Sequence, residues 1–148
     1  MNTLYFEDYD NAWSMETTRR TISEYDIMQF VTLVGLREPL FLDMQYLQEE
    51  TDYERRLAPG SLTFSYAEGL VIGSGMLEGT GMAYLGGDSK VLGPVYVDDT
   101  IHVELALHDK RETSKKDRGI VTTYNRVYNQ SGDLVLEYWP KRMIRRHS

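Results

Sequence analysis

The sequence predicts an α+β domain in which several antiparallel strands surround one apolar helix. Three observations support this fold class. A helical apolar pattern follows Ser23, a nearly uncharged helical stretch follows Pro59, and the chain beyond Thr100 alternates as strands do. The 148 residues suit a single domain, 1–148, and a hydrophobic fraction of 41% supplies its core.

The first part of the chain predicts one short strand and two helices. We expect the strand over about Trp13 to Ile22, followed by a helix that Ser23 caps and Asp26 reinforces from three residues on. Asp43 is placed to cap a shorter helix, Met44 to Gln48. The first helix carries one apolar face, formed by Ile27, Phe30, Val31 and Val34.

A central helix is expected from Pro59 to about Ile72. It is apolar on most sides, which is typical of a buried helix, and Glu68 is its only ionisable carboxylate. The segment Gly73 to Gly87 holds six glycines and is interpreted as a flexible connection.

The second half of the chain predicts strands, at least four in all. Thr100 to His108 alternates cleanly, and Gly119 to Tyr128 is rich in β-branched and aromatic residues. Asn129 to Asp133 has turn chemistry, after which Leu134 to Ile144 resumes strand-like sequence.

Composition excludes several classes of function. Sixteen basic against twenty-three acidic residues give a net charge of −7, which argues against nucleic-acid binding. The chain has no cysteine, no signal-peptide-like start and no apolar run that could span a membrane, so we expect a cytoplasmic protein. Its three histidines lack metal-ligand spacing, and no metal site is predicted.

Five segments give the chain a resemblance to a known family. They are Tyr5–Tyr9, Arg20–Ile27, Pro59–Thr63, Leu92–Thr100 and Val127–Gly132. In this order they resemble the MaoC-type hot-dog proteins, the (R)-specific enoyl-CoA hydratases and acyl dehydratases. The resemblance implies a hot-dog fold, a curved antiparallel sheet wrapped around one central buried helix. It also implies a dimer or doubled domain with an acyl-thioester tunnel between the halves.

The family's hydratase motif, Gly-Asp-x-Asn-Pro-(Leu/Ile)-His, corresponds here to the segment 35–41, GLREPLF. Its Asp, Asn and His become Leu36, Glu38 and Phe41. In the family the Asp and His activate water and move the α-proton, and general acid–base catalysis requires side chains that exchange protons. Leu36 and Phe41 cannot do so, and we interpret them as lining an apolar pocket.

Two carboxylates are candidates for relocated chemistry. Some hot-dog thioesterases carry their catalytic acid on the central helix, and Glu68 resembles that acid in position; it would act as nucleophile or general base. Alternatively, Glu68 pairs with an arginine or reaches solvent. Glu38 is the second candidate. The alternative for Glu38 is a solvated surface group beside Arg37.

The start of the central helix is the remaining candidate element. Free amides at Gly60 and Ser61 can polarise a thioester carbonyl, and Pro59 replaces a His that is common in the family. A basic tail, Lys141 to His147, can meet the phosphates of coenzyme A or end as a solvated or disordered terminus.

Three functions therefore compete. The protein is a MaoC-like acyl-thioester protein with altered chemistry, a thioesterase using Glu68, or a non-catalytic acyl-binding subunit of a hydratase/dehydratase pair. Its ligand is acyl-CoA or an acyl-carrier thioester, with coenzyme A as part of the substrate and no separate cofactor. We expect a homodimer or a higher oligomer of dimers, and no nucleic-acid or membrane partner.

Overall fold

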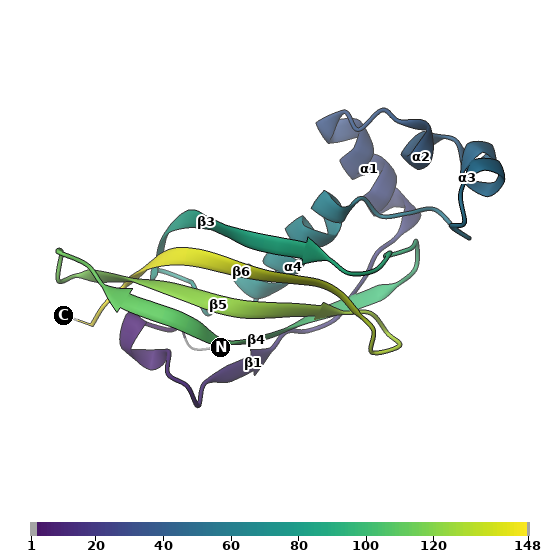
Figure 1. Cartoon of the computed structure of the whole chain (residues 1–148). Coiled ribbons are helices and arrows are strands. Elements are labelled where there is room, and N and C mark those ends of the chain that lie inside the picture. Colours follow the sequence, from purple (N-terminus) through teal and green to yellow (C-terminus); the bar gives the residue numbers. More distant parts are fainter. Residues whose placement is uncertain (1–2, 148) are drawn as a thin grey trace.

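One antiparallel sheet organises the molecule, as the computed structural model of residues 3–147 shows (Figure 1). The strand order is β1-β4-β5-β6-β3, and β2 pairs with β4 as well. The strands are β1 (Ser14–Glu16), β2 (Arg20–Thr21), β3 (Gly81–Val91), β4 (Thr100–Glu112), β5 (Arg118–Tyr128) and β6 (Leu134–Arg145). The predicted α+β class is confirmed.

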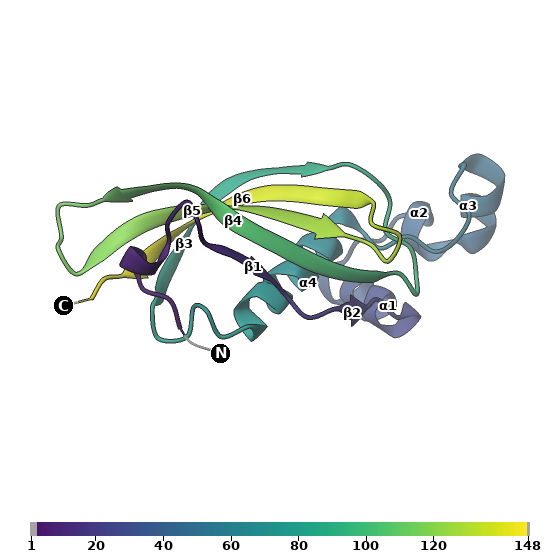
Figure 2. The same ribbon diagram turned by 90° about the horizontal axis from the view of Figure 1, so that it is seen from below.

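The central helix α4 (Gly60–Gly73) lies under the curved sheet (Figure 2). Its buried face packs into the core through Leu62, Ala67 and Val71. The opposite face is exposed in the single chain and repeats a small residue at every fourth position: Ser61, Ser65, Gly69 and Gly73.

Three helices form a unit beyond one end of the sheet, opposite the end where the C-terminus lies (Figures 1 and 2). They are α1 (Glu24–Val34), α2 (Pro39–Leu42) and α3 (Met44–Glu50). The predicted caps are confirmed: the Asp26 amide donates to the Ser23 hydroxyl at 3.1 Å, and Asp43 accepts from the amides of Gln45 and Tyr46.

Two predicted elements were wrong. The segment 13–22 forms two short strands instead of one, both paired with β4. The glycine-rich segment is a connection of turns only as far as Thr80, because β3 begins at Gly81. A Cβ at Gly87 would lie 2.1 Å from the Trp139 carbonyl oxygen, so β3 needs a glycine there to pair with β6.

Candidate functional site

An apolar cavity of about 370 Å³ lies where α2, the start of α4, the β3–β4 connection and β6 meet. Its wall is largely aliphatic and aromatic, which suits a hydrocarbon group. The lining residues are Leu40, Phe41, Tyr53, Leu57, Ala58, Pro59, Gly60, Thr63, Val91, Leu92, Gly93, Pro94, Val95, Val135 and Leu136.

The motif segment 35–41 reaches this cavity through a fixed backbone. Gly35 adopts φ 75°, a left-handed conformation that ends α1, and its amide donates to the Val31 carbonyl at 3.0 Å. Pro39 then opens α2, where its missing N–H is not needed. The turn brings the Phe41 ring to the cavity wall.

Arg56 holds this turn in place, and sequence reasoning missed it. Its Nη1 donates to the Phe41 carbonyl at 3.0 Å, and its Nε donates to Glu24 Oε1 at 3.0 Å. The Arg56 side chain is only 13% exposed, so it links the loop after α3 to both α1 and α2. Its partners are distant in sequence, and no local pattern marks them.

The structure brings together some of the predicted binding residues but not all. Phe41, Pro59 and Gly60 line the cavity. Leu36 is instead partly buried against the core, and Ser61 is exposed at the first turn of α4.

The start of α4 offers the expected free donors. The amides of Leu62 and Thr63 donate to the Pro59 carbonyl at 2.9 and 3.1 Å. In the described part of the chain the amides of Gly60 and Ser61 have no acceptor. Gly60 therefore presents an unpaired N–H beside the cavity.

Glu68 lies about two turns after Gly60 on α4, outside the cavity lining. Arg142 Nη2 donates to its Oε1 at 2.6 Å, and the Tyr138 hydroxyl donates to the same oxygen at 2.9 Å. The Glu68 side chain is 14% exposed and that of Arg142 is 11% exposed, so the pair is largely shielded from solvent. Glu68 is therefore paired with an arginine, which is one of the alternatives considered from the sequence, and is not a free carboxylate in a cleft.

Glu38, the second candidate acid, is exposed. It occupies the N-cap position of α2 without a side-chain capping bond. It does not line the cavity either, so both candidate carboxylates stand apart from the apolar chamber in the single chain.

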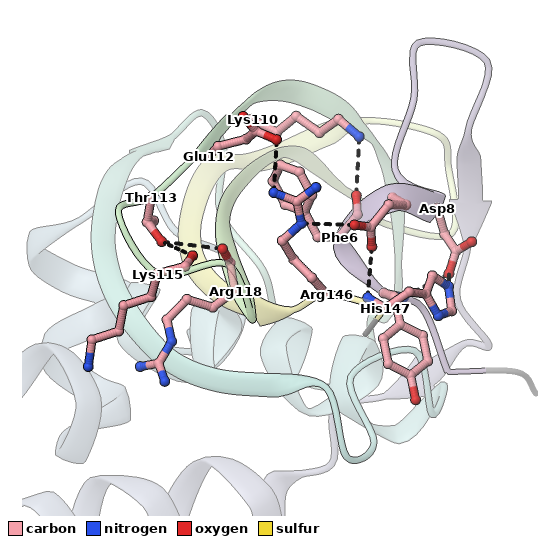
Figure 3. A network of polar contacts seen from close by, with 11 residues as sticks. Phe6, Asp8, Lys110, Glu112, Thr113, Lys115, Arg118, Arg146 and His147 are labelled. Atoms are coloured by element: carbon pink, nitrogen blue, oxygen red, sulfur yellow. Dashed lines mark hydrogen bonds and ion pairs between the residues drawn. The ribbon is translucent and has the colours of Figure 1, made fainter.

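The basic residues near the C-terminus are not a disordered tail, which corrects that alternative. Arg146 pairs with Glu112 at 2.8 Å and with Glu7 at 2.9 Å, and Lys110 donates to the Phe6 carbonyl (Figure 3). None of the residues 141–147 lines the cavity.

A group of carboxylates and one imidazole forms on the sheet edge. His102 Nε2 lies 3.0 Å from Glu104 and 3.4 Å from Glu16, and all three ligand atoms fall within 4.8 Å of one another. Glu16 reaches Glu104 because their strands pair in register, which the linear spacing of the histidines did not reveal. A hydrogen bond between His102 Nε2 and Glu104 holds two members of this group together.

Comparison with known proteins identifies the family. The profile of the MaoC like domain family matches residues 12–129, and the chain belongs to this family. It is 32% identical over 117 residues to Protein MaoC of Klebsiella aerogenes, which covers 77% of this chain. The chain spans about a third of that relative's length, 33%.

Solved structures agree with the fold. A monoamine oxidase regulatory protein from Archaeoglobus fulgius is 31% identical, with a TM-score of 0.89 over 100% of this chain and 98% of that chain. The R-hydratase PhaJ1 of Pseudomonas aeruginosa is 27% identical, with a TM-score of 0.79 over 98% and 88% of the two chains. A Mycobacterium tuberculosis protein with a double hot-dog fold is 20% identical, with a TM-score of 0.86 over 98% of this chain and 45% of that chain. The predicted hot-dog fold is confirmed.

No helix in the described residues is both long and apolar enough to cross a bilayer.

Proposed function

We propose that the protein binds the acyl group of a thioester in the apolar cavity at the start of α4. The observation that carries this proposal is the Phe41 ring in the cavity wall, at the position where the family motif has its histidine. The unpaired Gly60 N–H beside the cavity can donate a hydrogen bond to the thioester carbonyl. Coenzyme A or a carrier protein supplies the thiol.

Binding rather than hydration is the favoured activity. Among the described residues that line the cavity, the polar side chains are Tyr53 and Thr63, and neither is a carboxylate or an imidazole, the groups that most often transfer protons in catalysis. Glu68 is held by Arg142 and Tyr138, which favours binding over hydrolysis as well. A non-catalytic acyl-binding subunit fits these contacts best.

A second hot-dog subunit is proposed to complete the assembly, either another copy or a related chain. β3 ends the sheet as an unpaired edge, and Tyr84 and Leu85 on it are 49% and 44% exposed. The exposed small-residue face of α4 permits close approach of another helix. A stable monomer of 17.2 kDa in light scattering would contradict this assembly.

The test is an affinity measurement by calorimetry with short acyl-CoA thioesters. Leu40→Asp places a charge in the cavity wall and is expected to lower affinity at least about tenfold, because that carboxylate loses solvation when the acyl group enters. Leu33→Asp is the matched control, since Leu33 is 80% exposed on α1 and outside the cavity.

Two activity assays accompany the binding measurement. Crotonyl-CoA hydration is expected far below that of a family member with the intact motif, and thiol release from acyl-CoA is expected at background. A hydration rate equal to that of an intact hydratase, or the absence of any acyl-CoA binding, would refute the proposed function.

A further inference from the structure

Three potential metal ligands converge where the edge strand β1 meets β4, away from the acyl cavity. They are Glu16 on β1 and His102 and Glu104 on β4. Along β4 these residues alternate with Val103 and Leu105, which are buried, so the side chains of His102 and Glu104 point away from the core. None of the three lines the cavity, so the group is independent of the proposed function.

The separations within this group suit a single metal ion. His102 Nε2 lies 3.0 Å from Glu104 Oε2 and 3.4 Å from Glu16 Oε1. Zn²⁺ binds imidazole nitrogen and carboxylate oxygen at about 2.0–2.2 Å, so neighbouring ligands of a tetrahedral ion lie roughly 3.4 Å apart. The His102 ring is also oriented by stacking on Tyr128, with ring centres 5.6 Å apart and planes at 23°. The ligand atoms are therefore close to the positions that one ion requires.

Two of the three groups are carboxylates that face each other without a permanent positive charge between them. Glu16 and Glu104 are directly paired across β1 and β4, and like charges in that position destabilise a sheet. Among the described residues, their ion-pair partner is His102, whose ring is charged only when protonated. Arg126 lies opposite Glu104 on β5, but its guanidinium carbon is 5.3 Å from the centre of the Tyr124 ring, and no ion pair joins it to Glu104 in the described part of the chain. A bound cation would remove this repulsion.

We propose that Glu16, His102 and Glu104 form a binding site for Zn²⁺. One imidazole and two carboxylates are a mixed nitrogen and oxygen donor set, which suits Zn²⁺ better than Mg²⁺, an ion that prefers oxygen ligands. Three protein ligands leave the fourth position of the ion for water. Because β1 is three residues long and lies at the edge of the sheet, the ion fastens this short strand to β4 (Figure 2).

The experiment titrates metal-free protein with ZnCl₂ by calorimetry at about pH 7.5, where an imidazole ligand is mostly deprotonated. The wild-type protein is expected to bind one Zn²⁺ per chain, and Glu16→Gln and His102→Gln are each expected to weaken binding at least about tenfold. His108→Gln is the matched control, because His108 lies on the same strand but belongs to no such group among the described residues. This control should bind Zn²⁺ as the wild type does.

Thermal unfolding supplies a second measurement, which separates a metal site from a simple ion pair. Zn²⁺ is expected to raise the Tm of the wild type but not that of Glu16→Gln, because binding to the folded state alone stabilises it. In metal-free protein Glu16→Gln is expected to raise the Tm, since it removes the repulsion between the two carboxylates.

Three results would each overturn the proposal. The first is Zn²⁺ binding that is absent in the wild type or unchanged in His102→Gln. The second is an equal rise in Tm with Mg²⁺, which would show general charge screening. The third is a lower Tm of metal-free Glu16→Gln than of metal-free wild type, which would show that His102 alone neutralises the carboxylates.

Discussion

Gly119 is a residue whose surroundings leave no room for a side chain. The Phe6 ring lies against its backbone, so that a Cβ at Gly119 would come within 2.4 Å of the ring. Lys110 Nζ and the Arg146 guanidinium carbon lie 4.7 and 4.9 Å from the centre of the same ring. Phe6 is therefore fixed between a glycine and two cations.

Gly119→Ala is expected to destabilise the protein by about 1–3 kcal/mol, because the ring must move out of a packed site. The measurement is urea unfolding. Gly93→Ala is the control, since the nearest atom that a Cβ there would meet is Val135 Cγ1 at 3.9 Å, an ordinary contact. Equal stability of the Gly119 variant and the wild type would show that Phe6 moves aside at no cost.

The Glu68–Arg142 pair supplies a second prediction at this scale. Glu68→Leu leaves the Arg142 guanidinium largely buried without its carboxylate, and it is expected to cost about 3 kcal/mol. The double variant with Arg142→Met should recover most of that loss, because apolar side chains of similar size replace the pair. Thermal unfolding measures the coupling, and additive losses in the double variant would argue against a buried pair.

Among the elements, α1 begins at a capping box. Ser23 and Asp26 exchange hydrogen bonds, and Asp26 also accepts from Tyr66 and Arg20. Burial opposes ionisation of Asp26, but hydrogen bonds from Ser23 and Tyr66 and the Arg20 charge outweigh it and lower its pKa. The capping box therefore fixes the start of α1. Through the hydrogen bond from Tyr66 to Asp26 it also connects α1 to α4.

Ser23→Ala is expected to destabilise the protein by about 1 kcal/mol, the usual loss for an N-cap. Ser114→Ala, in the exposed turn between β4 and β5, should change stability little. Chemical denaturation of both variants checks the comparison, and a loss no larger for Ser23 than for Ser114 would mean that the cap is dispensable.

Elements with local signals were predictable from sequence, and those defined by distant partners were not. The Ser23 cap, the left-handed Gly35 and the strands after Thr100 all follow from neighbouring residues. β3 was missed because glycines at a bulged edge strand resemble a loop. At the site, the motif indicated the apolar wall at Phe41, whereas Arg56 and Arg142 gain their roles only through residues brought near by folding.

At the scale of the whole molecule, ion pairs join the two ends of the chain. Glu7 accepts from the His147 amide and from Arg146 Nε, and the Tyr5 and His147 rings stack at 4.0 Å. Desolvation opposes ionisation of Glu7, yet these hydrogen bonds lower its pKa from 4.5 to about 2.

Because the pKa of Glu7 is depressed by folding, its contribution to stability is present above about pH 4.5 and is lost as the pH falls toward about 2. Glu7→Gln should therefore lower the Tm at pH 7, and the difference from wild type should shrink across that acidic range. Glu54→Gln is the control, because no ion pair of Glu54 exists among the described residues. A Tm difference independent of pH would contradict the assignment.

The placement of α1–α3 beyond the end of the sheet has a consequence for protein engineering. The segment that carries the cavity's motif wall is bounded by the Ser23 cap on one side and by Pro59 on the other, and Arg56 fastens it from within. It can therefore be exchanged as a cassette. Transplanting the corresponding helices of an active hydratase onto this sheet and α4, with Arg56 and Glu24 retained, offers a route to convert a binding chamber into a working hydratase.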